Sequence, residues 1–393
     1  MTAPQPLKGL RVVEFTHMVM GPTCAMVLAD LGAEVIKVEP IEGENTRRLL
    51  GAGAGFFPMF NRNKKSIGID LKSEAGAAVA QRLALSADVV AENFKPGVLR
   101  KFGLDYASLA ARNERLIYAS HKGFLPGPYE HRTALDEVVQ MMGGLAYMTG
   151  RPGDPLRAGT SVNDIMGGLF GAIGVLGALV QRGISGRGME VQSALFENNV
   201  FLMGQHMLQY AVTGQHPQPM PARDNPWAVY DVFTVRGGEQ IFLAAVSDAQ
   251  WQVFCDALGY ADLRADPALA TNNDRVRARP QLLATLRERL ADRRAAELAA
   301  IFEAAGLPFA PIRRPEDLFD DPHLQATGGL AEIELPDHGG HARTTLLPLT
   351  LQGERLGVRL QPPRLGAHTD ELLAGLGYGA AEIAQLRQSA TVA

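Results

Sequence analysis

The run from Ile165 to Val180 constrains the fold more than any other part of the chain, because none of its residues is charged. Three glycines in this run recur at three- and four-residue spacing, namely Gly167, Gly171 and Gly174. On a helix they share one face, which lets a neighbouring backbone approach closely. A membrane span needs about 20 apolar residues, more than this run contains, and Asp, Arg, Ser and Gly flank it. The sequence therefore predicts a buried helix of a soluble protein.

Asp164 stands directly before this run and has two interpretations. An aspartate in the first turn of a helix is commonly an N-cap, because the free backbone N–H groups and the helix dipole favour a negative charge there. The same position can also present a reactive carboxylate. The local pattern leaves both interpretations open.

Length and composition exclude several classes of protein. A chain of 393 residues exceeds a typical single core, so we expect two domains. The net charge of -4 gives no basis for binding nucleic acid, and no residue spacing indicates a metal site. Cys24 and Cys255 are too few for a disulfide framework, which favours a reducing compartment. The N-terminus lacks a signal-peptide pattern, so we expect a cytoplasmic protein with no membrane partner.

The first forty residues predict a strand–helix–strand unit of Rossmann type. Leu10–Phe15 and Ala33–Glu39 are typical of buried strands, and Cys24–Leu31 of the helix between them. The turn after the first strand contains Gly21 as its only glycine, so the dinucleotide fingerprint is missing and a nicotinamide cofactor is disfavoured. His17 lies in that turn, where a histidine is more often a packing or capping residue than a catalytic one.

Two basic stretches, Phe60–Ser73 and Glu92–Tyr106, follow this unit. Basic clusters are usually solvated surface. Here they stand at the ends of predicted strands in an acidic protein, where an α/β sheet binds its ligands, so they are candidates for binding phosphates. The basic residues concerned are Arg62, Lys64, Lys65 and Lys72 in the first stretch and Lys95, Arg100 and Lys101 in the second.

Several longer motifs give the chain a family resemblance. They are G-T-S-x-x-D before the glycine-rich run, K-S-I-x-x-D-L-K at 65–72, E-N-F-x-P-G at 92–97 and L-G-x-H-T-D-E at 365–371. In these motifs the chain resembles the class III CoA transferases, the CaiB-BaiF family that includes formyl-CoA transferase. The resemblance extends over almost the whole chain, from the turn at His17 to the motif near the C-terminus.

The resemblance implies roles for individual residues. Asp164 would be the catalytic nucleophile, with His17 and Asp136 nearby in roles that the sequence does not assign. Coenzyme A would be a substrate and not a permanently bound cofactor. Its contacts would be Ile69, Lys72, Asn93, Phe94, Lys95 and Lys101.

Some positions depart from relatives within the family. Met18 and Val19 differ from formyl-CoA transferase, and Pro40 replaces an arginine that touches CoA, so formyl and oxalyl specificity is not implied. In the racemase branch a catalytic histidine precedes the aspartate that corresponds to Asp136. Leu135 occupies that place here, so an acyl-CoA racemase or isomerase remains the less favoured alternative.

The expected reaction is transfer of CoA from an acyl-CoA, with succinyl-CoA as a candidate, to a small carboxylate or dicarboxylate. The intermediates would be an aspartyl anhydride and an aspartyl-CoA thioester. Arg47 is a candidate partner for the distal carboxylate of the acceptor, because a planar guanidinium suits a carboxylate. An exposed arginine at a helix start is the alternative interpretation.

The predicted fold class is α/β, with a Rossmann-like large domain built on a parallel sheet and a smaller α+β domain. The large domain would span residues 1–213, followed by a proline-rich linker at 214–226, the small domain at 227–315 and a return segment at 316–393 that completes the large domain. The family resemblance implies an interlocked homodimer.

Overall fold

The computed structural model describes residues 3–223 and 225–393. The chain forms two compact units, one of Met1–Pro221 together with Pro322–Ala393 and one of Ala222–Asp321. The predicted division placed the linker at 214–226 and the return at 316, close to these two crossings.

The first unit is built on a six-stranded sheet in which every pair of neighbours is parallel. The strand order is β3-β2-β1-β4-β5-β6, so the direction of progression along the sheet reverses between β1 and β4. This is the Rossmann order, and it confirms the predicted parallel sheet. The strands are β1 (Arg11–Phe15), β2 (Glu34–Glu39), β3 (Lys64–Gly68), β4 (Val89–Glu92), β5 (Ile117–Lys122) and β6 (Glu190–Ala194).

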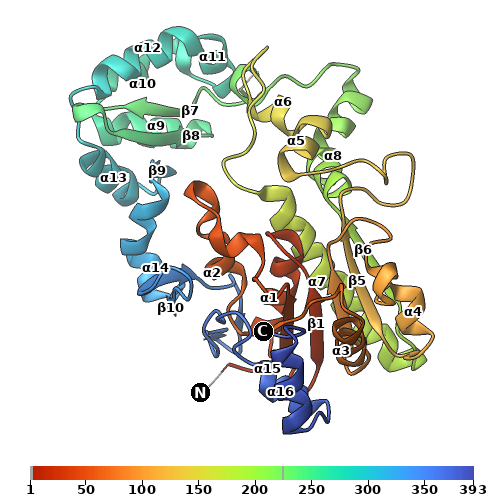
Figure 1. The fold of residues 1–393 in the computed structure, drawn as a ribbon. Coiled ribbons are helices and arrows are strands. Elements are labelled where there is room, and N and C mark those ends of the chain that lie inside the picture. The colour runs from red at the N-terminus through yellow and green to blue at the C-terminus, as the bar shows by residue number, and fades with distance from the viewer. Residues whose placement is uncertain (1–2, 224) are drawn as a thin grey trace. The chain divides into compact units, whose positions relative to one another are not determined.

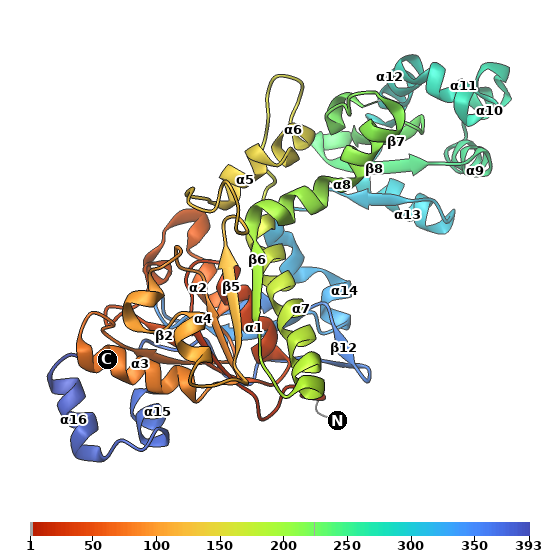
Figure 2. The same cartoon turned by 90° about the vertical axis from the view of Figure 1, so that its right-hand side faces the viewer.

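Helices cover both faces of this sheet, as Figures 1 and 2 show. One face packs against α1 and α7, in a core that includes Leu28, Val35 and Val175. The other face packs against α3 and α4, around Val79, Leu83 and Leu109. These helices are α1 (Met20–Asp30), α7 (Val162–Ser185), α3 (Glu74–Leu85) and α4 (Tyr106–Ala110), with the short α2 (Phe56–Phe60) following β2.

The glycine-bearing face of α7 packs as the sequence predicts. A Cβ added at Gly168 would lie 2.5 Å from the backbone oxygen of Met20, and one added at Gly171 would lie 2.3 Å from the ring of His121. Only glycine permits these approaches. The expectation of a buried helix was wrong for the opposite face, where Ile173, Val180 and Ile184 are more than half exposed.

By length and composition alone, α7 is also the one helix among the described residues that could cross a membrane. That property is shared by core helices of soluble proteins. Here the inward face of α7 packs against α1 and the sheet, while its outward face remains apolar and exposed.

Two helical segments of the chain are each divided into two shorter helices. The segment from Thr133 to Gly150 forms α5 (Asp136–Met142) and α6 (Leu145–Thr149), separated by Gly143 and Gly144. Gly144 has a φ of +87°, and a Cβ on Gly143 would lie 2.1 Å from the side chain of Asn199 in α8 (Leu195–Thr213). Packing against α8 therefore requires glycine at the break. The segment Pro280–Ala304 likewise forms α12 (Arg279–Leu290) and α13 (Ala295–Ala304).

The second unit has a three-stranded antiparallel sheet packed against helices. Its core includes the aromatic residues Phe233, Trp251, Phe254 and Phe302. The strands are β7 (Val229–Thr234), β8 (Gln240–Ala245) and β9 (Phe309–Pro311); besides α12 and α13, the helices are α9 (Asp248–Leu258), α10 (Ala261–Ala265) and α11 (Asn272–Arg277).

The last segment of the chain returns to the first unit. Its C-terminal residues lie beside the loop after β3, where the N–H of Asp70 donates to the carbonyl of Thr391 at 2.9 Å and the N–H of Ala393 donates to that of Gly68 at 3.0 Å. The elements are α14 (Pro322–Ala326), β10 (Leu330–Glu334), β11 (His341–Thr345), β12 (Thr350–Leu351), β13 (Glu354–Arg355), α15 (Thr369–Gly375) and α16 (Ala380–Gln388).

Candidate active site

The turns after β1 and β4 meet at the point where the strand order reverses. The side-chain oxygen of Asn93 accepts the N–H of His17 at 3.0 Å, and its amide nitrogen donates to the carbonyl of His17 at 2.8 Å. The rings of His17 and Phe94 lie 5.5 Å apart. Open α/β sheets bind their ligands in the crevice at this position.

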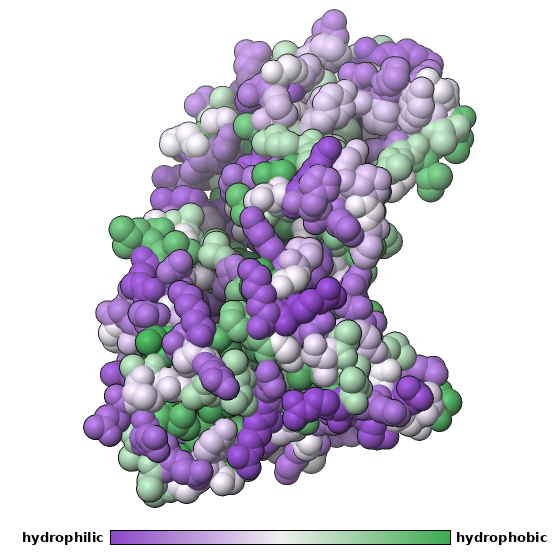
Figure 3. Space-filling view, turned by 45° about the vertical axis from the view of Figure 1, so that its right-hand side comes forward, coloured by the Kyte–Doolittle hydropathy of each residue, from purple (hydrophilic) through white to green (hydrophobic). Residues whose placement is uncertain are grey.

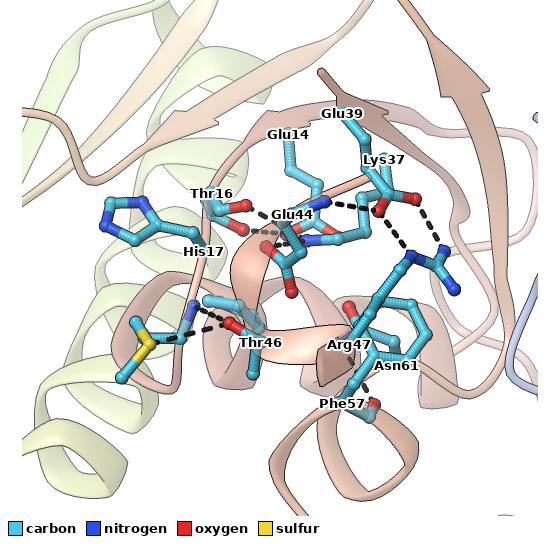
Figure 4. A network of polar contacts seen from close by, with 12 residues as sticks. Glu14, Thr16, His17, Lys37, Glu39, Glu44, Thr46, Arg47, Phe57 and Asn61 are labelled. Atoms are coloured by element: carbon cyan, nitrogen blue, oxygen red, sulfur yellow. Dashed lines mark hydrogen bonds and ion pairs between the residues drawn. The ribbon is translucent and has the colours of Figure 1, made fainter. Parts of the chain in front are cut away.

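The turn that carries His17 is held in an unusual conformation. Met18 has a φ of +64°, a backbone conformation that residues with side chains rarely adopt. The hydroxyl of Thr46 accepts the N–H of Met18 at 3.2 Å, and the buried ammonium of Lys37 donates to the carbonyl of Thr16 at 3.0 Å (Figure 4). These two contacts hold the backbone of the turn in place. They also occupy the N–H of Met18, and Asn93 occupies that of His17, so neither N–H is free to bind an oxyanion.

His17 is exposed to solvent. Partial exclusion of water by the surrounding protein and the positive charge of Lys37 both lower its pKa. His17 is therefore neutral at neutral pH, a state in which an imidazole can accept a hydrogen bond at one nitrogen and donate at the other.

The structure uses Arg47 differently from the predicted substrate contact. Arg47 is buried, and its guanidinium donates to both carboxylate oxygens of Glu39 at 2.7 Å (Figure 4). It also pairs with Asp337 at 3.0 Å and lies over the ring of Phe57. Its charge is thus compensated within the protein, and we do not retain Arg47 as a substrate residue. The alternative of an exposed arginine does not hold either.

Asp164 lies in the first turn of α7 but does not cap it. The backbone N–H groups of Asn163 and Asp164 donate to one carboxylate oxygen of Asp136, at 2.7 and 3.2 Å. The second oxygen of Asp136 accepts from the side chain of Gln140, which in turn accepts the N–H of Ala158. Asp136 therefore caps the helix from outside it, and the carboxylate of Asp164 receives no hydrogen bond from the described residues.

The surroundings of Asp164 shift the pKa of its carboxyl group far from the ordinary value for an aspartate. Burial, followed by the nearby negative charge of Asp136, raises its pKa to about 7, and Arg157 opposes the shift. A carboxylate with such a pKa is a better nucleophile than an ordinary one, because it is poorly stabilised as an anion.

Asp164 and His17 lie at the same end of the sheet. Helices α1 and α7 run in the same direction, since Gly168 packs on Met20 and Thr23 while Gly171 packs on Cys24. Met20 follows His17 by three residues, and Gly168 follows Asp164 by four. The first turns of both helices therefore face the carboxyl ends of the strands.

A pocket of about 460 Å³ opens at the carboxyl ends of β1, β2 and β4. Three of the predicted CoA residues, Ile69, Lys72 and Phe94, line it, together with Phe15 and Phe102. The remaining three do not line it. Asn93 lies at the His17 turn, exposed Lys95 donates to Thr133 at 3.3 Å and lines a second pocket, and Lys101 is exposed.

The basic residues of the two predicted stretches differ in whether their charges are paired. Arg62, Lys64 and Lys65 form ion pairs with Asp30, Glu14 and Glu34, and the first two are fully buried. These three ion pairs stabilise the sheet and its contact with α1. By contrast, the ammonium groups of Lys72 and Lys101 have no ionic partner among residues 3–223 and 225–393. Within the same residues, no group of three His, Cys, Asp or Glu side chains is arranged to hold a metal ion.

Comparison with known proteins decides the family. The family model described as CoA-transferase family III matches residues 7–369. The chain belongs to CoA-transferase family III. The resemblance that the motifs indicated is confirmed, and the protein is an enzyme that uses CoA thioesters as substrates.

This CoA-transferase has relatives of similar length. It is 33% identical to a succinate–glutarate CoA-transferase from Agrobacterium fabrum, over 94% of this chain and 96% of the relative. It is 34% identical to a formyl-CoA:oxalate CoA-transferase from Rhodopseudomonas palustris, over 98% and 97%. The crystal structure of a CAIB/BAIF family protein from Brucella suis, 35% identical, covers 95% of this chain and 100% of that chain with a TM-score of 0.86.

The sequence did not lead us to predict three residues of this CoA-transferase that support the site, namely Lys37, Gln140 and Thr46. Lys37 stands between the apolar residues Ile36 and Val38 in a predicted strand, which indicates a buried, paired charge. Gln140 follows Asp136 by four residues, the spacing at which helical side chains meet. Thr46 carries no such signal, because its contact with Met18 depends on the tertiary fold.

Proposed function

We propose that this CoA-transferase moves CoA from an acyl-CoA to a second carboxylate through covalent intermediates on Asp164. The observation that carries the proposal is the division of roles between two aspartates. Asp136 accepts the backbone N–H groups at the start of α7. The carboxylate of Asp164 is left without a hydrogen bond from the described residues, and its pKa is raised. A structural N-cap would have the opposite arrangement.

The proposed reaction has four steps that balance. The carboxylate of Asp164 attacks the thioester carbonyl and releases the CoA thiolate, which gives a mixed anhydride. The thiolate attacks the aspartyl carbonyl, releases the donor carboxylate and leaves CoA on Asp164 as a thioester. The acceptor carboxylate then displaces the thiolate, and the thiolate attacks the acceptor carbonyl, which restores Asp164.

The adenine nucleotide portion of CoA is proposed to occupy the pocket between Phe94 and Phe102. Aromatic and aliphatic side chains there suit a flat base, and the neighbouring cations Lys72 and Lys101 suit phosphates. From this pocket the pantetheine arm would pass the His17 turn toward Asp164, since all three lie at the carboxyl end of the sheet. His17 is proposed to contact the reacting end of the substrate as a neutral imidazole.

For the acceptor we propose a small dicarboxylate, with succinyl-CoA as a donor. The relatives described above are named for oxalate, succinate and glutarate, each of which has two carboxylates. The test is to incubate the enzyme with succinyl-CoA and a panel of mono- and dicarboxylates, and to identify new thioesters by mass. Exchange of the α-proton of an acyl-CoA in deuterated water, without any new thioester, would instead favour the racemase alternative.

We further propose that the chain forms a homodimer. Exposed apolar residues lie in small groups on the face drawn in Figure 3, as on most proteins. Helices α7 and α8 are different, because they carry a dense set that is more than 60% exposed: Ile173, Val180, Ile184, Phe201, Leu208 and Val212. A surface of this kind is typical of a partner interface. We expect sedimentation of the enzyme at micromolar concentration to give a dimer; a stable monomer would contradict the proposal.

The raised pKa of Asp164 predicts a pH dependence. Because only the ionised carboxylate attacks, kcat/KM should rise with pH through about 7, and at about pH 6 it should fall to roughly a tenth of its plateau. Asp136→Asn removes the neighbouring charge, so the pKa of Asp164 should fall and the acid limb should move to lower pH. Burial is the larger cause and remains, so the limb should not reach that of an ordinary aspartate.

The control for this profile is Asp154→Asn, which removes an exposed carboxylate in the turn before α7. Its acid limb should coincide with that of the wild type. An unmoved limb in Asp136→Asn would show that another group titrates. His17 is not that group, since its pKa is lowered and not raised.

A further inference from the structure

Glu92, the first residue of the E-N-F-x-P-G motif, is buried at the end of β4 and lines a pocket other than the proposed nucleotide pocket. One of its carboxylate oxygens accepts the N–H of Phe94 at 2.8 Å. The other receives the ammonium of Lys122, the last residue of β5, at 2.5 Å and also contacts the hydroxyl of Ser120. Lys122 in turn donates to the carbonyl of Phe94 at 2.9 Å.

The Glu92–Lys122 pair thus forms hydrogen bonds with both the N–H and the carbonyl of Phe94. The adjoining residue Asn93 holds both backbone polar groups of His17. The ring of Phe94 lines the 460 Å³ pocket and lies 5.5 Å from the ring of His17. A shift of the Phe94 backbone would therefore change the shape of the pocket and the position of the His17 turn together.

We propose that the Glu92–Lys122 ion pair is a positioning device for CoA binding, which sets the loop of Asn93 and Phe94 in its binding conformation before the ligand arrives. The inference rests on the proposed placement of CoA at this loop. Both partners are largely withdrawn from water, with 4% and 17% of their side chains exposed. Loss of one partner would leave the other as an unpaired charge, and the loop would move to let water reach it.

A purely structural ion pair near the other end of β4 supplies the comparison. Arg182 of α7 pairs with Asp88, just before the amino end of β4, at 3.1 Å. It also donates to the carbonyls of Asp88 and Arg115. Arg182–Asp88 resembles Glu92–Lys122 in linking a charged pair to backbone groups, but it lies at the opposite end of the strand from the CoA loop.

The experiment compares Lys122→Met with Arg182→Met in the full-length enzyme. Calorimetric titration with CoA itself measures affinity, and steady-state kinetics separates KM from kcat. We expect Lys122→Met to weaken CoA binding about ten-fold or more and to raise the acyl-CoA KM by a similar factor, with the acceptor KM unchanged and kcat at saturation within a few-fold. Arg182→Met should lower the melting temperature but leave CoA affinity unchanged.

Two further variants keep the inference testable. Lys122→Arg retains the charge and donors and should recover part of the affinity. Glu92→Gln, which is isosteric, should lose several-fold even if Lys122→Met fails to fold. Wild-type affinity in both Lys122→Met and Glu92→Gln, or an equal loss in Arg182→Met, would overturn the inference. Failure of the wild-type enzyme to bind CoA would instead overturn the proposed placement of CoA.

Discussion

Asp164→Ala should lose turnover by at least about a thousand-fold while it continues to bind CoA. The reason is that the proposed reaction has no other carrier. A carboxylate can hold an acyl group as an anhydride and then hold CoA as a thioester, and an acyl-serine or acyl-histidine could not do both. The other aspartate at the site cannot substitute, because both of its carboxylate oxygens already accept hydrogen bonds.

The measurement combines kcat, CoA titration and chemical trapping. With wild-type enzyme and an acyl-CoA donor, hydroxylamine or borohydride should modify Asp164 alone, as peptide mass would show. Asp154→Ala, which removes an exposed carboxylate ten residues earlier, should retain full activity and the trapped adduct. Retention of more than about a tenth of kcat by Asp164→Ala, a loss of less than roughly 1.4 kcal/mol in the barrier, is too small for a covalent carrier and would exclude the mechanism.

The layout of the sheet could be predicted from the sequence because it depends on local patterns. Short segments rich in aliphatic residues, such as Leu10–Phe15 and Ala33–Glu39, are typical of strands that are buried on both faces of a parallel sheet. The glycine spacing in α7 predicted a close approach, and the structure places Met20 and His121 against that face. Gly143 and Gly144 separate α5 from α6, but only the packing of Asn199 shows why the break lies there.

The candidate site was less predictable, because its contacts join residues that are distant in the sequence. Arg47 pairs with Asp337 across 290 residues, and no local pattern shows that its charge is already compensated. Asp136 lies 28 residues before Asp164, and only the fold shows that it caps the helix of Asp164 from another helix. The motif predicted Asp164 as the reactive residue. It could not show that Asp136 accepts the hydrogen bonds at the helix start and that the Asp164 carboxylate accepts none from the described residues.

The double variant Lys72→Ala, Lys101→Ala should raise the KM for acyl-CoA by about a hundred-fold or more. A hydrogen bond between an ammonium and a phosphate contributes roughly 1.5–3 kcal/mol, so each single variant should cost about ten-fold or more. Both lysines are exposed and without an ionic partner among the described residues, which leaves their charges available to a ligand. Because neither group touches the reacting carbonyl, kcat at saturation should change little.

Arg100→Ala is the matched control for this pair. Arg100 precedes Lys101 in the same short helical turn (Leu99–Phe102), and it is also exposed, but it pairs with Asp105 and lines a different pocket. Its KM should stay within about two-fold of the wild-type value.

The dependence of KM on salt concentration is a second measurement, because salt screens contacts with phosphates. The wild-type KM should rise with ionic strength, and the KM of the double variant should lose most of that dependence. If Arg100→Ala raises KM as much as Lys101→Ala does, the cations act only as a diffuse positive surface, and specific phosphate contacts at Lys72 and Lys101 are ruled out.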